Sequence, residues 1–375
     1  MKRIFGILFF LCLVWACSSD NEGEEPVTNP SGELSFERSA MLTNWADNII
    51  VPSYEAFTAD MADLNASFEL FKTDANEANL IALRASWLTA YTTWQRVSMF
   101  EIGPAETVGL RLNLNIYPTD PQKINDHITS GSYDLSLSSN RDAKGFPALD
   151  YLINGLDTND IAIVSKYNNS DRGALLSYMQ AVLDDMTALS SNVLSEWKAG
   201  YRDTFVANDG ASATASVDRM VNDYIFYYEK FLRAGKMGIP LGVFSGSPLP
   251  ENIEAYYEQE IANDLFLEGL SAVQDFFNGK HYGSNTSGES LTSYLDTLNT
   301  LKDGEDLKAV INNQFNTARE MVIGLSSFRS EIQNNTPPTN MFLAYDEVQK
   351  LVPLLKVDMV SAMSISIDFV DADGD

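Results

Sequence analysis

Long runs of apolar residues spaced three and four apart constrain this chain more than any other feature of its sequence. One such run reads Leu80, Leu83, Trp87, Tyr91, Trp94 and Val97. This spacing is typical of an amphipathic α-helix, because it places the apolar side chains on one face. Further long helices are predicted over residues 175–197, 217–232, 253–277, 307–332 and 341–363, the last with a kink at Pro353. Because almost no stretch alternates with period two, the sequence predicts an all-α fold.

Long helices joined by turn-rich loops favour helical bundles, and there are too many of them here for one four-helix core. With 375 residues, 45% of them hydrophobic, the chain can build more than one core. The segment 207–214 is rich in Gly, Ser, Ala and Asp and is the predicted hinge. We therefore predict two four-helix bundles packed side by side, over residues 35–205 and 210–375.

The first residues have the pattern of an export signal. Lys2 and Arg3 precede an apolar run that is too short to span a bilayer as a mature helix. Residues 1–16 are predicted to be a lipoprotein signal peptide, because Val14-Trp-Ala-Cys17 resembles a bacterial lipobox with Cys17 as the lipidated residue. The alternative is a plain secretory signal with an incidental cysteine.

Residues 17–34 are predicted to form an acidic, flexible tether. An acidic run directly after the lipidated cysteine resembles the surface-export signals of Bacteroidetes lipoproteins. We therefore expect a cell-envelope protein, anchored by its lipid to the outer membrane of a Gram-negative bacterium and either periplasmic or surface-exposed.

The net charge of the chain limits the classes of partner that it can bind. The formal net charge of −27 disfavours nucleic acid, whose phosphates need a basic surface. It also disfavours docking on anionic lipid head groups, so the membrane link would be the lipid alone. Such a surface is compatible with cation binding, but it also simply keeps exported proteins soluble.

One stretch reads as a short apolar helix between two glycines, Gly145 and Gly155. Pro147 fits its first turn, since proline costs no hydrogen bond there and its φ is already helical. Asp150 follows three residues later and shares a face with Pro147. At that spacing two side chains can reach one bound ion.

This stretch resembles the imelysin-like family, the peptidase M75 group, which is related to periplasmic iron-uptake proteins. Gly145, Pro147 and Asp150 fall where that family carries a Gly-x-His-x-x-Glu motif, with Pro147 in place of the histidine and Asp150 in place of the glutamate. Three other segments fit the same resemblance in family order: Glu101-Ile-Gly-Pro104, Gly238-Ile-Pro-Leu-Gly-Val243 followed by Glu254-Ala-Tyr-Tyr257, and Phe369-Val-Asp-Ala-Asp-Gly-Asp375. The resemblance implies a pair of four-helix bundles and, at the motif, metal ligation and proteolysis.

Two acids are the candidate metal ligands. Glu101 continues the apolar stripe of the 80–97 helix, and a long irregular connection, 103–144, leads from it to Asp150. We expect both acids to face one cleft between the bundles, where their oxygens would suit a hard ion such as iron or calcium. The alternatives are a hydrogen-bonded structural role for Glu101 and a capping or solvent-facing role for Asp150. The candidate ligand-binding residues beside them are Gly145, Phe146, Pro147 and Tyr151.

Zinc is disfavoured, because a catalytic zinc usually has three protein ligands, commonly including two histidines. The chain has only His127 and His281, in different halves, and Pro147 has no donor atom. At the end of the chain, alternate acids resemble the start of a calcium loop without its distal glutamate, and could instead cap the last helix or lie beside the cleft. These acids are Asp371, Asp373 and Asp375.

The sequence therefore favours a non-catalytic, lipid-anchored envelope protein that binds a ligand or metal between two helical bundles. The family resemblance links this role to iron acquisition and to iron-uptake proteins as partners. Two alternatives stay open, a metallopeptidase of the M75 type and an envelope protein-interaction module.

Overall fold

The computed structural model describes residues 36–368. The predicted signal peptide (1–16), Cys17, the tether (17–34) and the three terminal acids Asp371, Asp373 and Asp375 lie outside the described residues.

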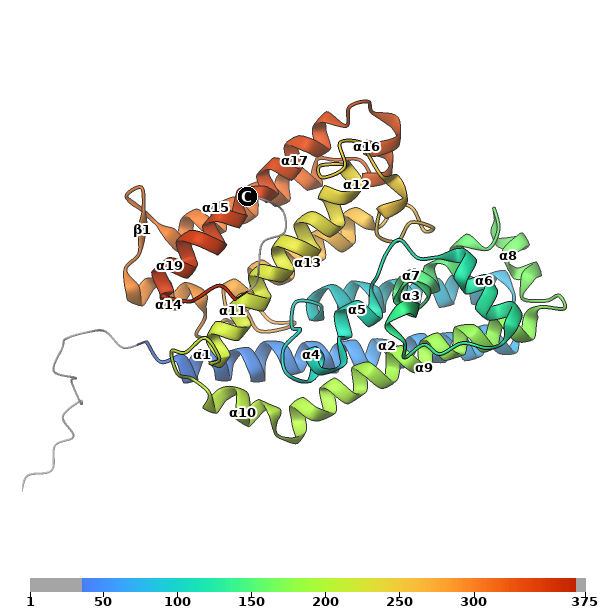
Figure 1. The fold of residues 1–375 in the computed structure, drawn as a ribbon, viewed down its shortest axis with the longest axis horizontal. Helices are drawn as coiled ribbons and strands as arrows, with labels where there is room; N and C mark the ends of the chain where they lie inside the picture. Colours follow the sequence, from blue (N-terminus) through green and yellow to red (C-terminus); the bar gives the residue numbers. More distant parts are fainter. Residues whose placement is uncertain (1–35, 369–375) are drawn as a thin grey trace, which may run out of the picture. The chain divides into compact units, whose positions relative to one another are not determined.

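Helices account for nearly all the regular structure up to residue 207. Their bounds in chain order are α1 (Arg38–Asn44), η1 (Trp45–Ile50), α2 (Val51–Thr73), α3 (Glu77–Val97), α4 (Pro104–Val108), α5 (Leu110–Leu114), α6 (Pro121–Ser130), η2 (Ser138–Ala143), α7 (Gly145–Asp150), η3 (Tyr151–Gly155), α8 (Asp160–Lys166), α9 (Arg172–Glu196), η4 (Trp197–Tyr201) and α10 (Arg202–Ala207). Four of these helices form the first bundle: α2 packs against α3 and α9, and α7 packs against α3 and α9 (Figure 1).

The second part of the chain repeats this pattern. Its elements are α11 (Ser216–Phe226), η5 (Tyr227–Gly238), α12 (Ile239–Leu241), η6 (Pro250–Asn252), α13 (Ala262–Phe277), α14 (Leu291–Leu298), β1 (Leu301–Lys302), β2 (Glu305–Asp306), α15 (Leu307–Ile323), α16 (Phe328–Asn334), α17 (Thr339–Gln349), α18 (Leu351–Pro353), η7 (Leu354–Met359) and α19 (Val360–Met363). The second bundle is a closed ring in which η5 contacts α13 and α17, and α15 contacts the same two helices.

Helix α3 of the first bundle also packs against α13 of the second, so the two bundles lie side by side (Figure 1). The strands within 36–368 are β1 and β2, an antiparallel pair of two residues each. The predicted all-α fold with two four-helix bundles is confirmed, while the exact bundle boundaries stay a prediction.

Two predicted helices differ from the structure. The helix expected over 253–277 begins only at Ala262, and the residues before it form a turn in which Ala255 has a φ of +54°. The helix expected over 307–332 is divided, because α15 ends at Ile323 and α16 begins after Ser327, whose side chain accepts a hydrogen bond from the Ser330 N–H at 3.2 Å. At Pro353, where a kink was predicted, the α-helical pattern gives way to the π-helical segment η7.

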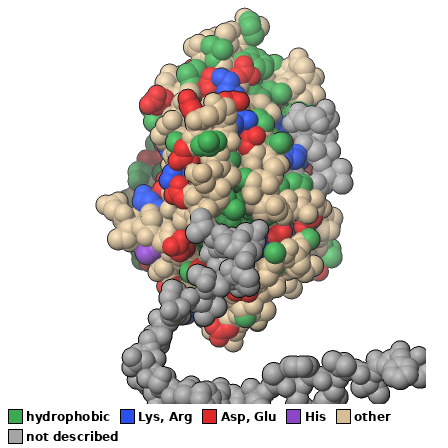
Figure 2. Space-filling view, turned by 90° about the vertical axis from the view of Figure 1, so that its left-hand side faces the viewer, with side chains coloured by type: hydrophobic (Ala, Val, Ile, Leu, Met, Phe, Trp, Pro, Cys, Tyr) green, Lys and Arg blue, Asp and Glu red, His purple; other side chains and the backbone are tan. Residues whose placement is uncertain are grey.

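Within residues 36–368, no helix combines the length and the apolar character needed to cross a membrane. On the face shown in Figure 2, acidic and basic side chains are interspersed with apolar ones.

Candidate functional site

The segment that resembles the family motif is a buried helix. Its six α7 residues, Gly145 to Asp150, are all buried, and η3 continues the helix to Gly155. Gly145 has a φ of +73°, and a Cβ at this position would lie 2.2 Å from the carbonyl oxygen of Leu114. Glycine is therefore required here both by the backbone conformation and by the close approach of α5.

Phe146 anchors this helix in the first bundle. Its ring is fully buried and stacks on Tyr91 of α3, with 4.4 Å between centroids and 2° between planes. The indole N–H of Trp87 donates to the Phe146 carbonyl at 3.3 Å. The structure thus places Phe146 in the core, and its predicted part in ligand binding stays a prediction.

Pro147 and Asp150 do line one pocket, which we call the motif pocket. The other residues of this cavity of about 280 Å³ are Tyr117, Pro118, Thr119, Pro121, Glu251, Ile253, Ala255, Tyr256 and Tyr257. Tyr151 lies next to it, with its ring 5.2 Å from that of Tyr257 and its hydroxyl accepting from the Asn125 amide at 2.9 Å. A ligand in this pocket would therefore meet tyrosine and proline rings and two carboxyl groups.

Asp150 is held by hydrogen bonds rather than exposed to solvent. One carboxyl oxygen accepts from the backbone N–H of Tyr257 at 2.8 Å, and the other accepts from the Asn154 amide at 2.9 Å. Burial raises the pKa of Asp150 to about 7, against the opposing effect of these hydrogen bonds. The acid thus ties α7 to the turn at 253–258.

Glu101 lies in a different pocket, which we call the Glu101 pocket. Its lining consists of Glu101, Ile102, Glu106, Arg111, Arg219, Asn222, Asp223, Phe226 and Asp368. The Glu101 carboxylate accepts the backbone N–H of Arg111 at 2.8 Å, and the Glu101 N–H donates to Asp223 at 2.7 Å. Burial raises the pKa of Glu101 to about 7, with Arg111 acting in the opposite direction.

The expectation that Glu101 and Asp150 share one cleft is therefore wrong. The chain after α3 turns toward Asp223 on α11, whereas Asp150 faces the turn at 253–258. Within residues 36–368 no group of three or more His, Cys, Asp and Glu side chains could hold a metal ion. A ligand role for either acid stays a prediction.

Neither of the two histidines hydrogen-bonds to Glu101 or Asp150. His127 Nδ1 is 3.2 Å from the Tyr178 hydroxyl, and His281 Nδ1 is 2.9 Å from the Thr286 hydroxyl. Neither imidazole is among the residues that line the motif pocket or the Glu101 pocket.

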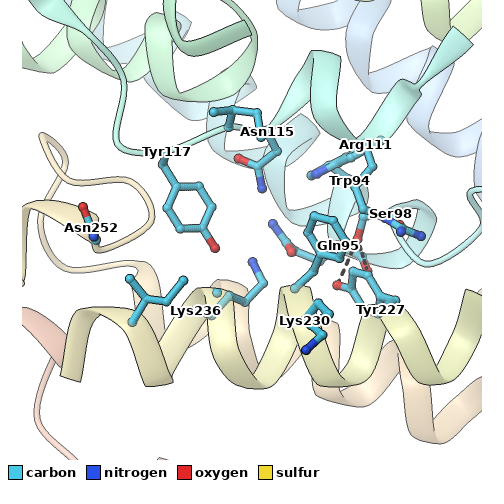
Figure 3. A pocket seen from close by; sticks show the side chains of 14 residues that line it. Trp94, Gln95, Ser98, Arg111, Asn115, Tyr117, Tyr227, Lys230, Lys236 and Asn252 are labelled. Atoms are coloured by element: carbon cyan, nitrogen blue, oxygen red, sulfur yellow. Dashed lines mark hydrogen bonds between the residues drawn. The ribbon is translucent and has the colours of Figure 1, made fainter. Parts of the chain in front are cut away.

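A third space, which we call the junction cavity, lies where the two bundles meet (Figure 3). It has a volume of about 180 Å³. It is bounded by α3, by α5 with the residues that follow it, and by η5. Its lining residues are Trp94, Gln95, Ser98, Arg111, Asn115, Ile116, Tyr117, Tyr227, Lys230, Phe231, Gly235, Lys236, Ile239 and Asn252.

A buried polar network adjoins this cavity. Lys236 of η5 forms an ion pair with Glu254, and the Asn115 amide donates to the same carboxylate at 2.8 Å. Asn115 in turn accepts from the Tyr91 hydroxyl at 2.6 Å, so the network ends at the ring that stacks on Phe146. Burial lowers the pKa of Lys236, and the adjacent Glu254 opposes that effect.

Arg111 forms the other polar side of the cavity. Its Nε–H donates to the Ser98 carbonyl at 2.6 Å, and Nη2 donates to Asp223 at 3.0 Å. The guanidinium also lies over the rings of Phe231 and Tyr227, 4.7 Å and 5.3 Å from their centroids. Among the described residues, Nη1 has no acceptor.

A family model described as imelysin, of the peptidase M75 group, matches residues 50–356. The chain belongs to the imelysin family.

Relatives of this imelysin share little sequence but much of its length. It is 22% identical over 341 residues to iron-regulated protein A of Synechococcus elongatus, covering 85% of this chain and 89% of that protein. A crystal structure from Parabacteroides distasonis, named an iron-regulated protein A precursor, superposes with a TM-score of 0.69 at 14% identity and covers 86% of this chain and 95% of that one. An imelysin-like protein from Psychrobacter arcticum gives the same TM-score at 15% identity and covers 90% and 99%. These structures support the imelysin fold.

The buried cations beside the junction cavity were missed by sequence reasoning. Lys236 follows Tyr228 and Leu232 at steps of four on an otherwise apolar helix face, and Arg111 stands between two leucines. A cation on an apolar stripe is the available signal, since lysine and arginine are almost never fully buried without a partner. The partners, Glu254 and Asp223, could not be read from that pattern.

Proposed function

We propose that this imelysin is a non-catalytic, lipid-anchored protein of the cell envelope that binds a ligand between its two bundles and serves iron acquisition. The junction cavity carries this proposal, because its walls come from α3 of one bundle and η5 of the other. Cavities between helices are common sites for small ligands. The iron link is supported by the name of the cyanobacterial relative, iron-regulated protein A.

The donor set favours binding over hydrolysis. A metallopeptidase needs metal ligands and a base for the attacking water. The Pro147 side chain has no atom that could bind a metal. Both carboxyl oxygens of Asp150 already accept hydrogen bonds, from the Asn154 amide and the Tyr257 N–H. A protein-substrate digest with and without chelator tests this part, and the expected result is no chelator-sensitive cleavage. Cleavage that is lost on Asp150→Ala substitution would contradict it.

Anchoring is proposed to proceed through a lipid on Cys17, with iron-uptake proteins of the envelope as partners. The acidic sequence supports a link that depends on the lipid rather than on head-group charge. Labelling cells with radioactive palmitate should mark the protein, and Cys17→Ala should abolish the label. An unlabelled protein that is nevertheless exported would support the plain secretory signal instead.

The ligand claim is tested by calorimetry on the purified protein. Titrations with ferric iron, ferrous iron, haem and calcium are compared under one buffer condition that contains no carboxylate. The proposal expects saturable heat with at least one iron species. Heat with none of the iron species would remove the iron role.

A further inference from the structure

The lining of the junction cavity is cationic in an acidic protein. The chain has 52 Asp and Glu against 25 Lys and Arg. Yet the described residues that line the cavity include Arg111, Lys230 and Lys236 and no acid. This lining contrasts with the mixed charges on the face shown in Figure 2. A donor-rich lining of this kind suits a ligand that carries oxygen acceptors.

The acids that pair with these cations contact them without lining the cavity. Glu254 pairs with Lys236, and Asp223 pairs with Arg111. Both acids are absent from the lining. The two pairs keep the buried cations charged and fixed, while the ammonium of Lys236 and Nη1 of Arg111 retain N–H groups for another acceptor.

Tyr117 adds a hydroxyl to which no other described residue makes a hydrogen bond. Figure 3 shows it directed into the cavity near Lys236, with Arg111 and Ser98 on the opposite side. Within residues 36–368 the Tyr117 hydroxyl has no hydrogen-bond partner, and burial raises its pKa well above the usual value. A neutral phenol beside an ammonium is a ready donor to a carboxylate.

The remaining walls are apolar, which favours a ligand with a carbon skeleton. Trp94, Ile116, Phe231 and Ile239 contribute rings and aliphatic groups. The volume of about 180 Å³ lies below the roughly 300–1,000 Å³ of pockets for drug-sized ligands, so the ligand is small. A bare inorganic anion would leave these apolar walls without a contact.

We propose that the junction cavity binds a small carboxylic acid as its carboxylate, held by Lys236 and Tyr117 on one side with Arg111 opposite. The inference rests on the proposed function and names the ligand class of that same cavity. A carboxylate there would be a second charged acceptor for the Lys236 ammonium, in addition to Glu254.

Calorimetry with iron-free ligands tests the class. Succinate, its neutral diamide and inorganic phosphate are titrated into the purified protein. We expect succinate to bind at least about tenfold more tightly than the diamide, since hydrogen bonds to charged groups are the stronger ones. Equal binding of the diamide, preference for phosphate, or no binding of succinate would each overturn the proposal.

Two matched tyrosine variants locate the site. Tyr117→Phe removes a hydroxyl that has no partner among the described residues, so the melting temperature should hold while succinate affinity falls about tenfold. Tyr256→Phe removes a hydroxyl from the motif pocket, which Tyr256 lines without reaching the junction cavity. It should leave affinity unchanged. Because Tyr117 lines both pockets, a fall in affinity with Tyr256→Phe would place the ligand in the motif pocket and overturn the proposal, as would unchanged affinity with Tyr117→Phe.

A charge-neutral pair of substitutions keeps the test informative if single variants fail to fold. Lys236→Met with Glu254→Gln removes both charges together, and succinate binding should be lost from a folded protein. Retained binding would overturn the role of Lys236.

The two proposals fail separately. Binding of ferric iron, ferrous iron or haem without binding of succinate would end the carboxylate inference and leave the proposed function standing. If succinate binds and none of the iron species binds, the carboxylate inference stands and the iron role is removed. Absence of both would end both.

Discussion

The side chains of Lys236 and Glu254 form an ion pair in which they are only 4% and 1% exposed. The two residues come from η5 and from the turn at 253–258, and Asn115 joins them by donating to Glu254 at 2.8 Å. One buried pair thus links the second bundle to the segment that follows α5. The cavity that we assign to ligand binding is built beside this link.

Lys236→Met should destabilise the protein strongly, because it leaves the Glu254 carboxylate buried without its cation. Breaking a buried pair from one side costs about 3–5 kcal/mol. Urea unfolding measures the loss. Adding Glu254→Gln should recover part of it, since the unpaired charge is then gone. A single variant within about 0.5 kcal/mol of the wild type, the range of ordinary surface substitutions, would show that the pair is not buried in solution.

Gly145→Ala should cost far more stability than Gly131→Ala. Both glycines have positive φ, +73° and +63°, which costs a residue with a Cβ about 1–2 kcal/mol. At Gly145 the added Cβ would also lie 2.2 Å from the Leu114 carbonyl oxygen, whereas at Gly131 nothing lies within 4 Å. Thermal melts of the two variants should separate clearly. Equal losses would contradict the close approach of α5 to α7.

Asp150→Asn should flatten the fall of stability with rising pH. The native pKa of about 7 exceeds the usual 3.8, so between these values the folded protein holds a proton that the unfolded chain has released. The free energy of unfolding therefore falls from about pH 4 to pH 7. The Asp150 carboxyl accounts for a loss on the order of 4 kcal/mol in the free energy of unfolding across this range, at about 1.4 kcal/mol for each pH unit.

The free energy of unfolding of the variant and of the wild type is measured at a series of pH values from 4 to 8, and the two are subtracted at each pH. Taking the difference removes the effect of the other acids, including Glu101. The gap should shift in favour of the variant up to about pH 7 and then stay constant. Parallel curves would mean that the Asp150 carboxyl ionises normally.

Glu101→Gln and Asp150→Asn should act independently. The two acids line different pockets and accept hydrogen bonds from different residues. Their effects on the free energy of unfolding should therefore add within about 0.5 kcal/mol in a double-mutant cycle at pH 8. A larger coupling energy would favour the single shared site that the structure does not show.

Local sequence patterns predicted much of the fold. The three-and-four spacing from Leu80 to Val97 predicts the helix that the structure shows as α3. Glycine and proline likewise mark the short helix at Gly145. The same patterns failed at Glu254, because the turn before Ala262 depends on contacts made elsewhere, notably with Lys236 and Asn115. Apolar periodicity identifies a helix but does not detect where a buried acid interrupts it.

The candidate site was harder to predict than the fold because its contacts are long-range. Asp150 meets Tyr257, more than a hundred residues later, and Glu101 meets Asp223. No spacing along the chain encodes which of these partners an acid will reach. The long connection from Glu101 to Asp150 suggested a common cleft, but it leads the chain past Arg111, which pairs with Asp223 instead.

A crystal structure of the protein grown with succinate would show whether the junction cavity holds a carboxylate. We expect density for the ligand in the junction cavity, with a carboxylate within hydrogen-bond distance of Lys236 Nζ and the Tyr117 hydroxyl. Density confined to the motif pocket beside Pro147 and Asp150, or a junction cavity closed by side chains, would contradict it.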